Sequence, residues 1–162
     1  AADFFGIDLP DYLDPISTSF GYIYYTFPHL DWKDKDVFDT HELYVSISYD
    51  CLLQPSFTWY WDIDNGHGSY LLFGIGHSFD LGNDISADIG MTVGYVGNKM
   101  LTMGCPRSGF ADMNFTGSVS IPVFNYFTIT PTCSYSIILD DSTYGDTASN
   151  EFYGGVSIGF EY

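Results

Sequence analysis

Strict alternation of apolar and polar residues is the feature that most constrains the fold of this chain. In residues 42–50 one face of the alternation carries Leu43, Val45, Ile47 and Tyr49, and the other carries Glu42, Tyr44, Ser46, Ser48 and Asp50. Successive side chains of a β-strand point to opposite faces, so a period of two marks a strand whose faces meet different surroundings. The pattern recurs along most of the chain and predicts an all-β fold.

Eight segments carry this alternation: residues 17–27, 42–50, 56–64, 70–81, 84–96, 110–121, 126–139 and 152–162. The first is the least decisive, because aromatic residues occur on both of its faces. Residues 1–16 have no strong period, so we assign them to an N-terminal segment and residues 17–162 to one β domain. Most segments reach the about 9–11 residues of a tilted membrane strand, against about 5–6 in globular domains. Pro131 cannot donate a ladder hydrogen bond and marks a bulge or an edge-like position.

The composition excludes several classes of protein. Hydrophobic residues make up 46% of the chain, yet no stretch approaches the about 18 uninterrupted apolar residues of a membrane helix. The 21 acidic residues outnumber the 4 basic ones, and the formal net charge of -17 would repel nucleic-acid phosphates. Cys51, Cys105 and Cys133 match no zinc or redox motif. We therefore expect no nucleic-acid partner, no metal site and no cofactor.

The charges are divided between the predicted strands and their connections. All four bases lie between strands, whereas nine acids lie within strands or at their ends, always on the face rich in Ser, Thr and Gly. An Arg or Lys that faces lipid at the bilayer midplane costs about 2–4 kcal/mol, so an uncharged apolar face fits a membrane barrel. We predict that seven acids line the lumen: Glu42, Asp62, Asp64, Asp80, Asp88, Asp112 and Glu161.

The connections between the predicted strands alternate in length. The long ones are residues 28–41, 97–109 and 140–151, and the short ones are 51–55, 65–69, 82–83 and 122–125. Only the short connection at 65–69 breaks the rhythm of short periplasmic turns and longer outer loops that outer-membrane barrels show. Such barrels also carry aromatic girdles at both membrane interfaces. The predicted girdle residues are Tyr49, Phe57, Trp61, Phe79, Tyr95, Phe160 and Tyr162.

Two parts of the chain resemble outer-membrane sequences. Residues 154–162 end on Tyr162 with apolar residues at alternate positions, which resembles the terminal strand by which bacterial outer-membrane proteins are recognised for assembly. The mid-chain resembles an uncharacterised porin-like outer-membrane family of environmental bacteria, in Phe57-Thr58-Trp59-Tyr60-Trp61-Asp62-Ile63-Asp64, Gly68-Ser69-Tyr70-Leu71 and Gly74-Ile75-Gly76-His77-Ser78-Phe79. This resemblance implies an antiparallel up-and-down transmembrane β-barrel, of about eight strands, or more if the chain is incomplete. It implies no substrate and no catalytic residues.

The predicted lumen face carries Ser, Thr, Gly and acids but no base. The interior of an eight-stranded barrel is just wide enough to be filled by side chains, and carboxylates without counter-charges are costly in a dry interior. We therefore expect a hydrated acidic interior. Such an interior suits a porin-like channel that prefers cations and passes small cationic or neutral solutes. A structural barrel without useful conductance is the alternative.

Catalysis is not expected from the histidines. His77 lies on the apolar face, but its neighbour Ser78 points to the opposite face, so the two cannot form a nucleophile and base pair. We predict an interfacial or hydrogen-bonded role for His77. His29 and His41 flank an acidic loop whose spacing matches no cation-binding motif, which favours a solvated loop.

The predicted location is the bacterial outer membrane, with the lipid bilayer and outer-membrane lipids as partners. The chain opens at Ala1 without a visible signal peptide, so export is inferred from the barrel pattern. A homo-oligomer or a larger outer-membrane assembly is an alternative, in which the apolar face covers a partner. A soluble secreted β-sandwich binding module is another, in which that face fills an internal core. Cys51 and Cys105 are predicted on opposite sides of the membrane and are not expected to meet.

Overall fold

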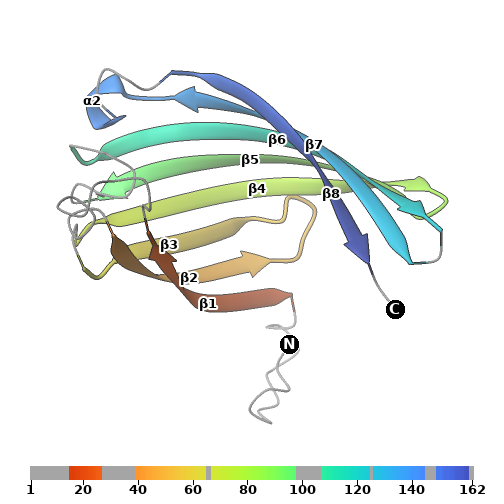
Figure 1. Cartoon of the computed structure of the whole chain (residues 1–162), viewed down its shortest axis with the longest axis horizontal. Coiled ribbons are helices and arrows are strands. Elements are labelled where there is room, and N and C mark those ends of the chain that lie inside the picture. The colour runs from red at the N-terminus through yellow and green to blue at the C-terminus, as the bar shows by residue number, and fades with distance from the viewer. Residues whose placement is uncertain are drawn as a thin grey trace, which may run out of the picture.

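The computed structural model describes residues 15–26, 39–64, 67–97, 107–124, 126–144 and 149–160. Eight antiparallel strands form one sheet in the order in which they occur along the chain (Figure 1). They are β1 (Ile16–Tyr25), β2 (Thr40–Tyr49), β3 (Ser56–Asp62), β4 (Ser69–Gly82), β5 (Ile85–Gly97), β6 (Gly109–Val123), β7 (Phe127–Ile138) and β8 (Glu151–Phe160). The predicted all-β fold, the number of strands and their up-and-down order are confirmed.

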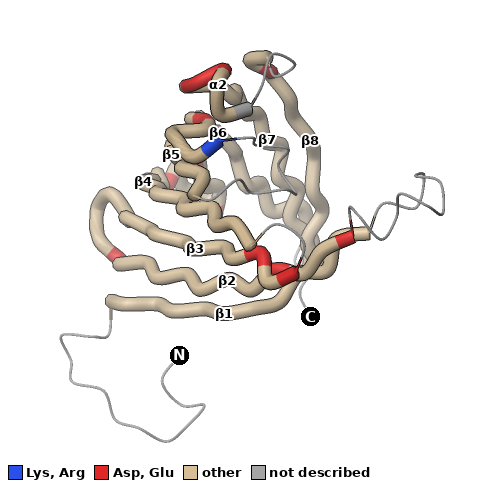
Figure 2. Tube along the Cα trace, turned by 90° about the vertical axis from the view of Figure 1, so that its left-hand side faces the viewer, with Lys and Arg blue, Asp and Glu red and all other residues tan. Residues whose placement is uncertain are grey.

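The sheet curls into a trough whose two edges are β1 and β8 (Figures 1 and 2). An up-and-down order of eight strands leaves β1 and β8 running in opposite directions. Among the strands that the structure describes, none pairs with the outer edge of β1 or of β8. Paired strands lie about 4.7–4.9 Å apart, and the curvature stops short of bringing the two edges together. The sheet is therefore open, where the sequence predicts a closed barrel.

The connections gather at two ends of the sheet. One end, here called the turn end, carries three of them: residues 50–55, 83–84 and 124–126. At the opposite end, the loop end, on the left of Figure 1, β1, β3, β5 and β7 finish and β2, β4, β6 and β8 begin; the other four connections are residues 26–39, 63–68, 98–108 and 139–150. Asn83 and Asp84 have φ angles of 55° and 60°, as both central residues of a type I′ hairpin turn require. Apart from residues 63–68, which are as few as residues 50–55, the connections at the loop end are longer than those at the turn end, as the sequence predicts.

Burial in this sheet is the reverse of that in a water-soluble domain. The buried residues are mostly polar: Thr40, Glu42, Asp62, Asp112, Ser134 and Thr143, beside the hydrophobic Val96 and Ala111. The apolar side chains are exposed on the outer, convex face, where the exposed fraction is 54% for Val45, 50% for Phe73 and 56% for Ile89. The alternation of the sequence therefore places polar groups on the inner, concave face and apolar groups outside.

A β-bulge between β5 and β6 shifts the phase of the alternation. Val93 pairs with Met113 but Tyr95 pairs with Phe110, so that Ala111 and Asp112 both lie opposite Gly94. Both bulge residues are buried. Phe110 consequently lies on the outer face, where its ring meets that of Tyr95 edge-on at a centroid distance of 5.4 Å.

Pro131 interrupts the ladder between β6 and β7 without shifting it. Ser118 pairs with Thr132 and Ile121 with Ile129, and this is the same register on both sides of the proline. Pro131 still pairs with Val156 of β8 on its other side. The missing N–H therefore leaves a local gap in the ladder rather than a bulge.

A short helix, α2 (Asp141–Tyr144), lies at the loop end against β6. Asp140 precedes it and accepts hydrogen bonds from the Ser142 hydroxyl at 2.7 Å and the Ser142 backbone N–H at 2.9 Å. These bonds hold the pKa of the Asp140 carboxyl below its ordinary value. Thr143 is buried beside Gly109, so α2 covers the start of β6. None of the helices in the described ranges has the length and apolar character needed to cross a membrane.

Candidate functional site

An acidic pair lies on the inner face at the loop end. Glu42 of β2 and Asp62 of β3 are direct cross-strand partners, with exposed fractions of only 1% and 0%. Asp62 Oδ1 accepts hydrogen bonds from Thr40 Oγ1 at 2.7 Å and from the Asp64 backbone N–H at 3.0 Å. The Tyr25 phenol hydrogen-bonds to the Glu42 carboxylate. Glu42 and Asp62 are thus the most buried carboxyl groups among the described residues of the inner face.

A third buried acid, Asp112, lies further around the inner face. The Tyr70 hydroxyl donates to both of its carboxylate oxygens, at 2.9 and 3.1 Å, and Asn114 Nδ2 donates to Oδ1 at 2.7 Å. Tyr70 comes from β4 and Asp112 from β6, so this contact spans β5 above Gly94. The bulge at Ala111 and Asp112 is what aims the carboxylate at the tyrosine.

A row of tyrosines crosses the inner face beside these acids. The rings of Tyr44, Tyr60 and Tyr70 follow one another with centroid distances of 5.7 and 6.1 Å. A glycine on the next strand makes room at each end of the row. A Cβ at Gly21 would lie 2.4 Å from the Tyr44 ring, and a Cβ at Gly94 would lie 2.1 Å from the Tyr70 oxygen. The two glycines therefore allow the end rings to lie flat across the sheet.

Gly94→Ala is expected to destabilise the protein by about 1–3 kcal/mol, because the new methyl group overlaps the Tyr70 phenol that holds Asp112. Gly90→Ala is the matched control on the same strand and face, since its Cβ would meet only the Ile75 carbonyl oxygen at 3.6 Å. Urea titration of the refolded proteins, followed by tryptophan fluorescence, measures the difference. Equal midpoints for the two variants would contradict this account of the tyrosine row.

The rest of the inner face is a surface of paired hydroxyls. Cross-strand pairs form between Ser46 and Thr58 at 2.8 Å and between Thr116 and Ser134 at 3.2 Å. Nearer the turn end, Ser78 donates to Asp88 Oδ1 at 2.5 Å. Groups of this kind satisfy one another across the strands and can also bind water. The inner face is thus hydrophilic along its length.

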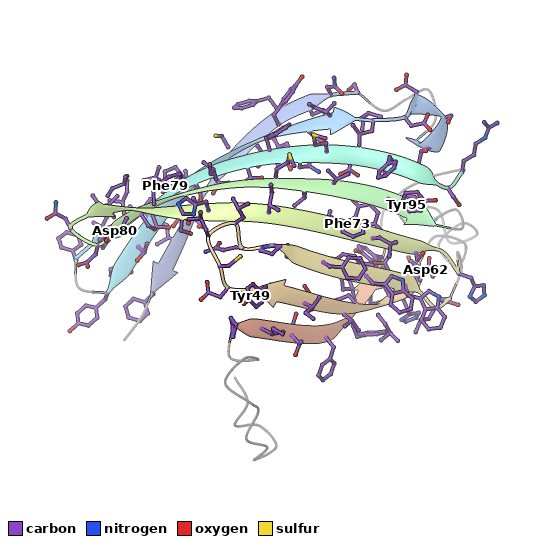
Figure 3. The ribbon with its side chains drawn as sticks, turned by 180° about the vertical axis from the view of Figure 1, so that it is seen from behind. Tyr49, Asp62, Phe73, Phe79, Asp80 and Tyr95 are labelled. Carbon is purple, nitrogen blue, oxygen red and sulfur yellow. The ribbon has the colours of Figure 1, made fainter. Side chains whose placement is uncertain are left out.

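The predicted lumen acids occupy different places. Glu42, Asp62, Asp88 and Asp112 lie on the inner face. Figure 3 marks Asp62 at the loop end and Asp80 at the turn end, where Asp80 Oδ1 accepts the Gly82 N–H at 2.8 Å. Asp64 lies beyond the end of β3, and its Oδ2 is 3.9 Å from His41 Nε2. Glu161 lies outside the described residues.

Acidic side chains outnumber basic ones on the inner face of the sheet. The only Lys or Arg in the described ranges is Arg107, at the loop end just before β6 (blue in Figure 2). The whole chain has 21 acids and 4 bases, so bases cannot neutralise more than a small share of the carboxylates. Among the described residues, no group of three or more His, Cys, Asp or Glu is arranged to hold a metal ion.

Aromatic residues gather on the outer face at both ends of the sheet. Figure 3 shows Tyr49 and Phe79 toward the turn end and Tyr95 at the loop end. Trp61 stacks on Trp59 at 6.0 Å near the loop end, and Phe160 packs against Phe127 at 5.1 Å near the turn end.

Phe57 pairs with Phe73, which lies in the middle of β4 rather than at its end (Figure 3). Tyr162 lies outside the described residues.

Two features of the outer face were not apparent from the sequence. His41 stacks on Tyr24 at 4.7 Å and hydrogen-bonds to the Tyr22 hydroxyl at the loop end. An apolar hollow of about 520 Å³ lies in mid-sheet around the small residues Gly117 and Cys133. Both depend on cross-strand pairing, which alternation within single strands does not reveal.

His77 takes the hydrogen-bonded role that the sequence predicts. Its Nδ1 lies 2.7 Å from the Leu52 carbonyl oxygen of the turn between β2 and β3. Its ring meets Phe79 edge-on at 4.5 Å. His77 is therefore tied to the backbone of a turn on the outer face. The acidic loop that follows His29 lies mostly outside the described residues.

Comparison with protein-family models, with curated proteins and with solved structures finds no match to this chain. The resemblance to a porin-like family therefore stays a prediction.

Proposed function

We propose that this protein is an outer-membrane β-barrel protein whose acidic inner face lines a cation-preferring channel. The observation that carries the proposal is the reversed burial. Val45, Phe73 and Ile89 are at least half exposed on the outer face, while Glu42 and Asp62 are buried on the inner one.

The outer face is difficult to reconcile with water. Burying a large apolar side chain is worth about 1.5–3 kcal/mol, and such side chains occupy the outer face of every strand. Leaving all of them in water would forgo on the order of tens of kcal/mol, more than the about 5–15 kcal/mol net stability of a typical domain. A continuous exposed apolar surface marks a membrane or protein interface. Its aromatic ends favour a bilayer as the partner.

The inner face supports a water-filled path rather than a packed core. Hydroxyls and carboxylates line much of it, with Glu42, Asp62, Asp88 and Asp112 among them, and no described strand carries a Lys or Arg. Rings of Asp and Glu select cations in channels by the sign of their charge. Glu42, Asp62 and Asp112 all lie on the inner face toward the loop end, on β2, β3 and β6, and are the candidate residues for this selection.

The proposal is tested by extraction, gel mobility and conductance. The protein should require detergent for extraction and should run faster on SDS gels before boiling than after it. In planar bilayers it should conduct, with a reversal potential that favours K⁺ over Cl⁻ in a KCl gradient. A mobility shift without conductance would point to a structural barrel, and solubility without detergent would refute the membrane assignment.

The two described cysteines offer a test of the lipid-facing surface. Cys133 lies on the outer face in mid-strand, and Cys51 lies in the turn between β2 and β3; both are free and exposed. In lipid nanodiscs, a charged maleimide should modify Cys51 at least about tenfold faster than Cys133, because thiolate formation needs water. Single-cysteine variants, C105S/C133S and C51S/C105S, separate the two rates.

Unfolding in urea should abolish the difference between these variants, because both thiols then face water. Equal rates with the charged reagent in nanodiscs would mean that Cys133 faces water.

A further inference from the structure

The two edge strands of the sheet, β1 and β8, lead to an inference that rests on the proposed function. β1 and β8 are ten residues long each, and no described strand pairs with their outer edges. Inside a bilayer no water is available to satisfy backbone N–H and C=O groups, and each unsatisfied group costs several kcal/mol. Both edges must therefore pair with other strands in the membrane.

Neither edge strand has the features that keep strands from associating. Natural edges are protected by lysines, prolines, bulges or short length. β1 reads Ile-Ser-Thr-Ser-Phe-Gly-Tyr-Ile-Tyr-Tyr and carries no charge, and β8 carries only Glu151, at its first position. Each strand is regular and as long as β2. Both edges are thus suited to strand addition.

The chemistry of the two edges matches. Gly21 of β1 faces Tyr44 on the inner side, so Phe20, with an exposed fraction of 87%, lies outside. On β8, Ser157 is on the inner side opposite Thr130, and Ile158 lies outside, 70% exposed. A junction between β8 and β1 would continue both the polar inner face and the apolar outer face. Because the two strands run in opposite directions, it would also continue the antiparallel order.

Closure of one chain on itself fits these data poorly. An eight-stranded barrel has an interior just wide enough to be filled by side chains, which leaves no room for a water-filled path along the inner face. The inner face already carries the large rings of Tyr44, Tyr60 and Tyr70. A barrel of about 16 strands encloses an aqueous channel.

We propose that two copies of this chain close one barrel, with β8 of each copy paired to β1 of the other. The two-fold axis runs along the barrel, and both junctions are identical antiparallel pairs. Each copy then supplies half of the wall, and the acids of both copies line one shared lumen. The partner that covers the edges is thus a second copy of this chain.

Cross-linking between differently tagged copies tests this arrangement. In a background in which Cys51, Cys105 and Cys133 are serine, one copy carries a single cysteine on β1 (Ser17, Ser19 or Ile23), and the other carries one on β8 (Gly155 or Ser157). All of these positions are on the inner side, and the panel allows for the unknown register. The copies are co-expressed, membranes are collected, and a short bis-maleimide is added. We expect a band of twice the chain mass that carries both tags, in at least one combination.

Two controls separate the possible outcomes. Ser46→Cys with Thr58→Cys joins neighbouring strands whose hydroxyls lie 2.8 Å apart, and should cross-link within one chain. One chain carrying cysteines on both β1 and β8 should give dimers. Cross-linking of that chain only within itself would overturn the proposal in favour of self-closure, and no cross-link across the whole panel would mean that other strands cover the edges. Neither result affects detergent extraction and the heat-dependent mobility shift, which test the membrane assignment separately.

Discussion

Ile89→Arg is expected to destabilise the protein in a lipid bilayer by about 2–4 kcal/mol, which is the cost of an Arg that faces lipid near the midplane. Ile89 lies on the outer face in the middle of β5 and is 56% exposed in the isolated chain. In a water-soluble protein an exposed position of this kind would change the free energy of unfolding by no more than about 0.5 kcal/mol. The substitution therefore separates lipid from water as the surroundings of this face.

Ser118→Arg is the matched control, one strand away on the opposite face. The Ser118 hydroxyl lies 3.4 Å from Asp88 Oδ2, so an arginine there meets a carboxylate on the hydrophilic side. We expect this variant to fold about as stably as the parent. Refolding into vesicles of phosphatidylcholine, followed by urea titration and by the gel-mobility shift, measures both. If Ile89→Arg and Ser118→Arg behaved alike, the lipid-facing assignment of the outer face would be wrong.

The strands themselves could be predicted because their pattern is local. The observed bounds differ from the predicted ones by no more than two residues at any end that the structure describes. The faces of β1 were the exception, since aromatic residues occupy both. Pairing decides the question: the ring of Tyr44 needs the space above Gly21, and this places Phe20 and Tyr22 outside. A single strand contains no information about its neighbour.

The bulge at Ala111 and Asp112 shows that residues two positions apart along a strand do not always share a face of the sheet. Phe110 and Asp112 are two residues apart and would share a face in a regular strand. The extra residue opposite Gly94 sends Phe110 outside and keeps Asp112 inside. The bond from Tyr70 to Asp112 joins residues 42 positions apart and follows from the sheet order and the bulge together. Alternation predicts which residues are polar and inward, but not which of them meet.

Closure of the sheet could not be predicted for a different reason. Strand number and alternation are the same in a sheet that closes on itself and in one that closes with a partner. What distinguishes the two is curvature and the space that the inner side chains need, and both depend on the three-dimensional arrangement. The tyrosine row is therefore more informative than the count of strands about how wide a closed form of this sheet would have to be.

Glu42→Gln with Asp62→Asn is expected to lower the ratio of K⁺ to Cl⁻ permeability by about tenfold. Both carboxylates lie on the inner face at the loop end and are direct cross-strand partners. Because both carboxylates are buried, a passing ion stays farther away; two unit charges about 7 Å apart in water interact by about 0.6 kcal/mol, which is about threefold in local ion concentration for each charge and about tenfold for the two. Gln and Asn keep acceptors for the Tyr25 and Thr40 hydroxyls, so the sheet should retain its fold.

The control is Asp50→Asn with Asp84→Asn. It also removes two carboxylates, but from connections at the turn end, outside the strands. Asn is well suited to the φ of 60° at Asp84, so this control should fold normally. Reversal potentials in a KCl gradient compare the two variants, with the gel-mobility shift as the measure of folding. A large loss of selectivity in the first and little in the second would assign selection to the buried acids. Equal changes would mean that ions respond only to the net charge of the protein, and the inner face would then lose its role as the selective lining.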